Sequence, residues 1–124
     1  MTEPRRESLD PKQIFERAGL KPPRRYDLAG AHGETGLDSL IEFRMRMSAA
    51  DFEAFLAGNG LAATAFRPGP AGLLGADHGF WTPGQEKALS IAAFPRGAGR
   101  TLDVAVTPPD ADGVVTVYVR AFTL

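Results

Sequence analysis

The chain has 124 residues, with 14 Lys and Arg against 15 Asp and Glu, two His and no Cys. This length is that of one ordinary domain, and a chain without cysteine has no disulfide framework, no thiolate nucleophile and no Cys-type zinc site. A net charge of −1 gives no overall field to attract nucleic acid or acidic lipid, and no segment approaches the ~18 apolar residues that span a bilayer.

Residues 1–20 lack the apolar segment of a secretory signal peptide. We therefore expect a cytoplasmic protein. The alternative is the soluble part of an exported protein whose leader is not in this sequence.

The basic residues are mostly arginine: eleven Arg against three Lys. One interpretation is recognition of anions by guanidinium groups, which bind carboxylates and phosphates with two parallel hydrogen bonds. The other is a genome rich in G and C, whose codons favour Arg, Ala, Gly and Pro. Residues 1–26 hold seven basic and four acidic residues, so positive charge is concentrated in this segment.

A short helix is predicted near the N-terminus. Asp10 is a suitable N-cap, Pro11 suits the first helical position, and Gln13 completes a capping box. Gly19 supplies the left-handed residue that ends the helix, and residues 21–25 form an extended, proline-containing linker. We expect residues 1–36 to form an N-terminal segment and residues 37–124 to form a single α+β domain.

A strand and a second helix follow. Residues 39–47 alternate apolar and charged side chains, the period of a half-buried strand. Ser48 then caps a helix in which Phe52, Phe55 and Leu56 form one apolar stripe. On the charged face of the strand, Arg44 and Arg46 could form an anion site or could simply be solvated.

The last third indicates an antiparallel meander, with strands over residues 87–94, 101–107 and 114–122 separated by turns. The predicted fold is α+β: an antiparallel sheet of about four strands in the order β-α-β-β-β, with one main helix on one face and the short N-terminal helix. One core should include Phe43, Phe52, Phe55, Leu56, Val104 and Val117.

The long connection before the meander is the predicted site. Residues 67–83 are rich in Gly and Pro, and long loops in small domains often carry function. Trp81 is the only tryptophan and lies near Asp77 and His78, so we expect these three to line a binding pocket. The opposing interpretation is that Trp81 anchors the loop in the core. Thr82 to Lys87 could begin a helix or a turn followed by a strand.

A metal site is the alternative. His32, Glu34, Asp77 and His78 supply two imidazoles and two carboxylates, although neither their spacing nor any H-E-x-x-H motif is diagnostic. We expect no cofactor. Nucleic acid is not an expected partner, because the meander lacks the interleaved basic and aromatic residues of an RNA-binding sheet.

The sequence also resembles a known group of domains. The Ser-capped helix with Asp51 to Leu56, the Gly-rich loop, Trp81 to Pro83 and the terminal Val115 to Val119 are similar to small α+β domains of high-GC actinobacteria, some of them soluble parts of lipoproteins. The resemblance covers about residues 39–124 and implies no activity or catalytic residue. The lipobox cysteine of the lipoprotein version is absent here.

These features are compatible with two functions. The first is a non-catalytic binding or protein-interaction module for an unidentified protein or small molecule. The alternative is a small metal-assisted hydrolase or related enzyme that uses the two histidines and the nearby carboxylates.

Overall fold

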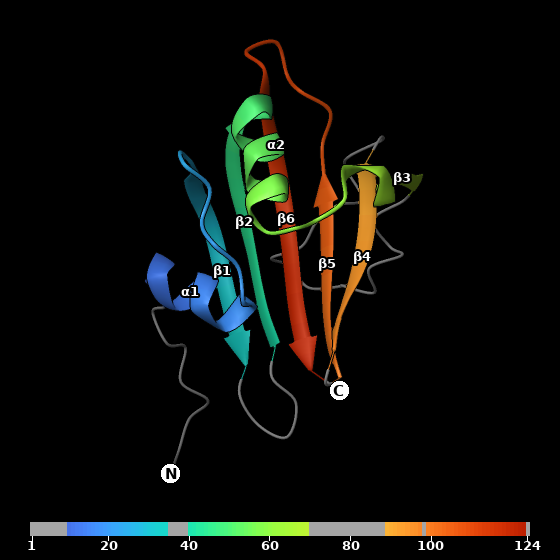
Figure 1. Ribbon diagram of the computed structural model, residues 1–124. Helices are drawn as coiled ribbons and strands as arrows, with labels where there is room; N and C mark the ends of the chain where they lie inside the picture. The colour runs from blue at the N-terminus through green and yellow to red at the C-terminus, as the bar shows by residue number, and fades with distance from the viewer. Residues whose placement is uncertain (1–9, 35–39, 70–88, 98, 124) are drawn as a thin grey trace.

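The computed structural model describes residues 10–34, 40–69, 89–97 and 99–123 and shows a six-stranded antiparallel sheet with two α-helices on one face (Figure 1). The strands are ordered β1-β2-β6-β5-β4-β3 across the sheet. The elements are α1 (Pro11–Ala18), β1 (Asp27–Glu34), β2 (Leu40–Ser48), α2 (Ala49–Gly58), a 3₁₀ turn (Ala63–Ala65), β3 (Arg67–Gly69), β4 (Leu89–Gly97), β5 (Arg100–Val106) and β6 (Val114–Thr123).

Helix α1 begins and ends where its capping residues predicted. The Asp10 carboxylate accepts a hydrogen bond from the Gln13 amide at 2.8 Å, and the Gln13 side chain accepts one from the Asp10 amide at 3.2 Å. Gly19 ends the helix with a φ of 70°, a conformation that costs glycine little because it has no Cβ. Local sequence signals thus define this helix, although it has only eight residues.

Helix α2 follows β2 without an intervening loop. The Ser48 hydroxyl accepts a hydrogen bond from the Asp51 amide at 3.0 Å, as the N-cap prediction required. Phe52, Phe55 and Leu56 are buried beneath the helix. The strand–helix unit predicted for residues 39–56 is therefore confirmed.

The alternation along each strand separates two faces of the sheet. The helix face carries the core, and both helices pack on β2 and β6, which are neighbours in the sheet. The predicted core residues Phe43, Phe52, Phe55, Leu56, Val104 and Val117 all belong to one buried cluster. We call the opposite side, which carries Glu42, Arg44, Asp103, Ala105, Tyr118 and Arg120, the far face.

The sheet is larger than the four strands predicted. The sequence Asp-Leu-Ala-Gly-Ala-His-Gly-Glu of β1 has two glycines and no β-branched residue, so its composition does not indicate a strand. It nevertheless pairs with β2 from Asp27 to Glu34, with an irregularity between Leu28 and Gly30. Strand β3 has three residues and pairs only with β4. Tertiary pairing, rather than local propensity, produces both strands.

Helix α1 is part of the same core as α2. Ile14 is fully buried and Phe15 is 2% exposed. The Phe15 ring packs edge-on against Phe43 of β2, with ring centroids 5.2 Å apart. The predicted N-terminal segment, residues 1–36, thus contributes a helix and strand β1 to the sheet domain; whether residues 37–124 fold without it stays a prediction.

Neither described helix has the length or apolar character needed to cross a bilayer.

Candidate functional site

The site predicted from the sequence lies largely outside the described residues. Asp77, His78 and Trp81 all fall between residues 70 and 88, and so does the ambiguous Thr82 to Lys87 segment. His32 and Glu34 belong to β1, where the register sets His32 opposite Glu42 and Glu34 opposite Leu40. The predicted binding loop therefore stays a prediction.

The residues of the alternative metal site also lie outside the described side chains. Among the side chains that the structure describes, no three His, Cys, Asp or Glu residues gather closely enough to hold a metal ion. The proposed ligands His32, Glu34, Asp77 and His78 are not among those side chains. The metal site therefore stays a prediction.

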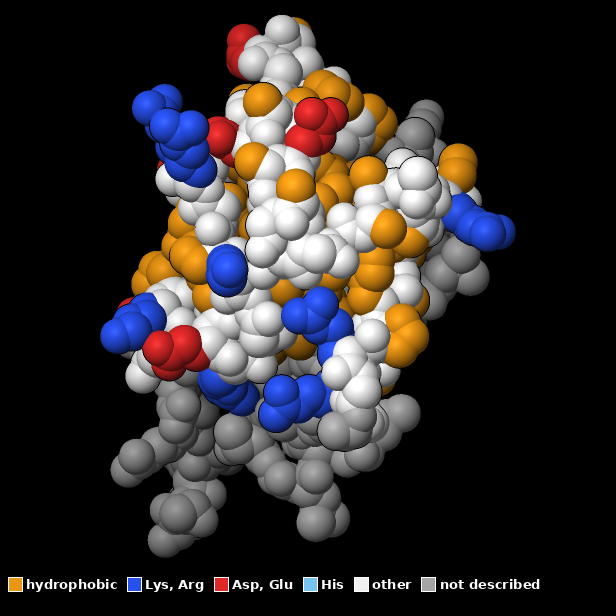
Figure 2. Space-filling view, viewed as in Figure 1, with side chains coloured by type: hydrophobic (Ala, Val, Ile, Leu, Met, Phe, Trp, Pro, Cys, Tyr) orange, Lys and Arg blue, Asp and Glu red, His pale blue; other side chains and the backbone are white. Residues whose placement is uncertain are grey.

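The described residues contain a different candidate, a pocket of about 660 Å³ at one end of the sheet. We call it the arginine pocket because Arg24, Arg25 and Arg46 line it. The first two arginines belong to the linker between α1 and β1, and the third belongs to β2. In Figure 2 one group of Lys and Arg side chains lies at the upper left, near Asp and Glu side chains, and the other Lys and Arg side chains in this view lie mostly in its lower half.

Two prolines restrain the linker just before its arginines. Pro22 and Pro23 precede Arg24, and proline fixes its φ near −65° and disfavours the helical conformation in the residue before it. Pro23 is buried, whereas Arg24 and Arg25 are exposed. No hydrogen bond or ion pair to another described residue engages either guanidinium. Two adjacent, exposed arginines thus follow a segment that proline restrains.

The third arginine is held by a turn between β5 and β6. A nitrogen of the Arg46 guanidinium lies 3.6 Å from a carboxylate oxygen of Asp110. The Asp110 carboxylate also accepts hydrogen bonds from the amides of Asp112, at 2.9 Å, and Val114, at 3.0 Å. These backbone bonds, with a smaller contribution from Arg46, lower the pKa of Asp110, so it stays ionised at neutral pH.

Two further carboxylates, Asp27 and Asp51, line the pocket. The half-buried Asp51 accepts a hydrogen bond from the Ser48 hydroxyl at 2.9 Å and lies in the first turn of α2, where the helix dipole offsets a negative charge. Asp27 is exposed at the start of β1. Three guanidinium groups against these two carboxylates give the lining one net positive charge, which the neighbouring Asp110 carboxylate offsets at Arg46. The guanidinium groups of Arg24 and Arg25 are the ones that pair with no described carboxylate.

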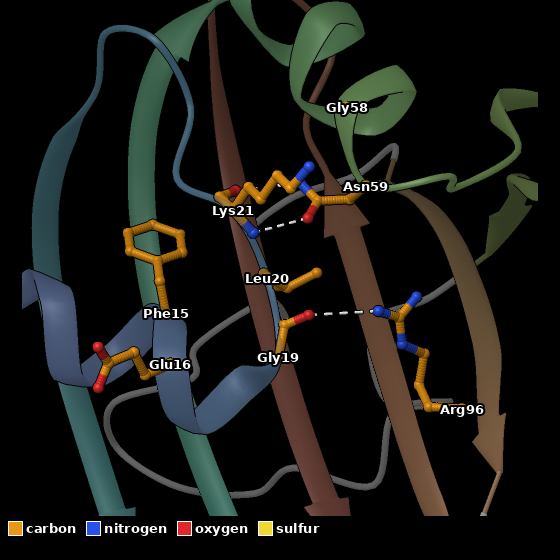
Figure 3. Close-up of a pocket in the computed structure, with 8 residues that line it drawn as sticks. All are labelled: Phe15, Glu16, Gly19, Leu20, Lys21, Gly58, Asn59 and Arg96. Carbon is orange, nitrogen blue, oxygen red and sulfur yellow. Dashed lines mark hydrogen bonds between the residues drawn. The ribbon is translucent and has the colours of Figure 1, made fainter.

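A second pocket lies where α1 and α2 end, beside β4 (Figure 3). Asn59 spans its upper edge: its side-chain oxygen accepts from the Lys21 amide at 2.7 Å, and its nitrogen donates to the Lys21 carbonyl at 3.0 Å and to the Phe55 carbonyl at 2.9 Å. From β4, Arg96 donates to the Gly19 carbonyl at 3.3 Å. The pocket is therefore a junction of three chain segments.

The charges in this junction already have a structural role. Both helices direct their C-terminal, partly negative ends toward it, and Lys21 and Arg96 supply the positive charge that such ends favour. An added anion would meet two negative helix ends. We therefore treat this pocket as part of the framework and the arginine pocket as the better candidate for anion binding.

The far face of the sheet carries a buried row of charged residues. The register sets Arg120 of β6 opposite Glu42 of β2 and opposite Asp103 of β5. Glu42 is fully buried and Asp103 is 8% exposed. Burial raises the pKa of Asp103, and the positive charge of Arg120 opposes this rise only in part. The row thus places one cation between two buried carboxylates on three neighbouring strands, and at Asp103 the cost of burying the charge exceeds the attraction to Arg120.

The sequence predicted an anion-binding role for one of the three arginines that line the arginine pocket. Arg46 was a candidate for an anion site, and it does line the pocket, whereas its predicted partner Arg44 is half-buried on the far face opposite Tyr118. For Arg24 and Arg25 the sequence predicts an extended linker within a basic N-terminal segment, and the structure has a bend at these two residues. The local excess of positive charge in residues 1–26 was the available signal.

No protein-family model, curated protein or solved structure matches this chain. The resemblance to actinobacterial domains therefore stays a prediction.

Proposed function

We propose that this protein is a binding module that recognises an anionic group of a partner at the arginine pocket. The observation that carries the proposal is the pair Arg24 and Arg25, exposed on a proline-restrained linker beside Arg46 in a pocket of about 660 Å³. Guanidinium groups bind carboxylates and phosphates through paired hydrogen bonds. A restrained backbone lowers the entropy lost when a ligand binds.

The Asp110 carboxylate should lower the affinity of this site for an anion. It competes with a ligand for Arg46, because both would contact the same guanidinium. An Asp110→Asn variant keeps an oxygen that can accept from the amides of Asp112 and Val114, so the turn should persist while the charge is removed. This variant should bind an anion more tightly than the parent protein.

Calorimetric titration with a tetraglutamate peptide at low ionic strength tests the proposal. Removing two exposed ion pairs costs about 1–2 kcal/mol, so an Arg24→Ala, Arg25→Ala double variant should bind about five- to thirtyfold more weakly. The matched control is the Arg67→Ala, Arg100→Ala double variant, which removes the same charge from exposed positions on β3 and β5. Equal weakening in both variants, or no effect of Asp110→Asn, would contradict the site.

A further inference from the structure

An apolar pocket lies directly beside the arginine pocket, with Tyr26 lining both. It measures about 390 Å³, and we define it by its apolar lining residues Phe15, Leu20, Pro22 and Tyr26. In Figure 2 hydrophobic side chains lie below the upper-left group of Lys and Arg. The positive and apolar surfaces are thus continuous along the linker.

The floor of the apolar pocket is fixed by the core. Phe15 is 2% exposed and packs edge-on against Tyr26, with ring centroids 5.3 Å apart and planes at 79°. Leu20 is 7% exposed. Pro22 forms an exposed wall from a segment that proline holds extended. A side chain entering this pocket would find its surface already formed.

The apolar pocket and the arginine pocket differ in the charged side chains that line them. Lys12 and Glu16 line the apolar pocket and carry opposite charges, whereas the arginine pocket presents two guanidinium groups, those of Arg24 and Arg25, that pair with no described carboxylate. A ligand with an acidic and an apolar part would therefore place its acidic part toward Arg24 and Arg25. Pro22 and Arg25 are three positions apart, so their Cα atoms lie within about 11 Å. A ligand that contacts both would carry its two parts about one to three positions apart in an extended peptide.

We infer that the two pockets form one site for an extended acidic segment of a partner protein, in which an apolar side chain enters the apolar pocket while acidic side chains contact the arginines. This inference rests on the proposed function and adds the second recognition element. A protein segment fits better than a lipid surface, because the apolar residues line a hollow that receives a side chain rather than a protrusion that enters a membrane.

The test compares two labelled peptides of equal charge, Ac-Glu-Glu-Ala-Phe-NH₂ and Ac-Glu-Glu-Ala-Ala-NH₂, by fluorescence polarisation with the full chain. Burial of the phenyl group should make the first bind about tenfold more tightly. A Pro22→Ser variant should reduce that advantage to about twofold. Pro68→Ser, at an exposed position of β3 on the opposite edge of the sheet, is the matched control and should keep the advantage.

The outcomes separate the two proposals. Equal affinities for both peptides, still lowered by the Arg24→Ala, Arg25→Ala variant, would overturn the apolar element and leave anion recognition standing. If neither peptide binds, both the apolar element and anion recognition at the arginine pocket are overturned. Binding to phosphatidylserine vesicles that is lost in the Pro22→Ser variant, without peptide binding, would replace the protein partner with a membrane surface and overturn the inference.

Discussion

Asn59 and Lys21, 38 positions apart in the chain, are joined by two hydrogen bonds between the Asn59 side-chain amide and the Lys21 backbone. A third bond, from the same side chain to the Phe55 carbonyl, ties the pair to the end of α2. Asn59 is the only asparagine in the chain. The linker that carries Arg24 and Arg25 is therefore attached to the second helix three residues before the first arginine.

Replacing Asn59 should loosen this attachment. Asn59→Ala removes three hydrogen bonds to backbone groups, and we expect the free energy of unfolding to fall by about 1–3 kcal/mol. Urea denaturation measures this change. Glu53→Ala, at an exposed position of the same helix, is the control and should change stability by less than about 0.5 kcal/mol. Equal effects of the two substitutions would show that the Asn59 bonds contribute nothing.

Helix α1 should contribute to stability as a core element. Ile14→Ala empties a fully buried position and should cost about 2–5 kcal/mol, in the range expected for Phe55→Ala in α2. Thermal and urea melts of both variants provide the comparison. A cost below about 0.5 kcal/mol for Ile14→Ala would show that α1 is detachable.

Removal of residues 1–25 addresses the predicted domain boundary more directly. The remaining chain keeps α2 and strands β1 to β6, with most of the buried core. We therefore expect a cooperative melt at a lower temperature than that of the full chain. Loss of cooperativity would place the N-terminal segment inside the minimal folding unit.

The buried Asp103 should make stability depend on pH. Its pKa is raised in the folded state above the ordinary value of 3.8, so between these two values the folded protein holds a proton that the unfolded chain has released. The free energy of unfolding should therefore fall as the pH rises through this window. In Asp103→Asn this fall should be absent, and the variant should gain stability relative to the parent as the pH increases. Urea denaturation from pH 3 upward tests the sign; a parent curve parallel to that of the variant would contradict it.

Local signals predicted much of this fold. Asp10, Gln13 and Ser48 form the caps that their spacing indicated, because capping depends on residues only three positions apart. The alternation in β2, β5 and β6 likewise identified the buried faces. Strand β1 could not be found this way, since its Gly-containing sequence becomes a strand only through pairing with β2.

The candidate site was harder to predict than the fold. The arginine pocket unites a linker, the end of β2 and the start of α2, and their proximity follows from the sheet order β1-β2-β6. The charge of Arg24 and Arg25 is visible in the sequence, but the pocket beside them is a product of tertiary structure. Trp81, the most prominent residue of the predicted loop, lies outside the described residues.

The most direct test of anion recognition is an NMR titration of the ¹⁵N-labelled protein with tetraglutamate, following the arginine Nε–H signals. Binding at the arginine pocket should shift the signals of Arg24, Arg25 and Arg46 together, with one dissociation constant, and leave those of Arg67 and Arg100 in place. Shifts of equal size at all five arginines would indicate nonspecific attraction, and an absence of shifts at Arg24 and Arg25 would contradict the proposed function.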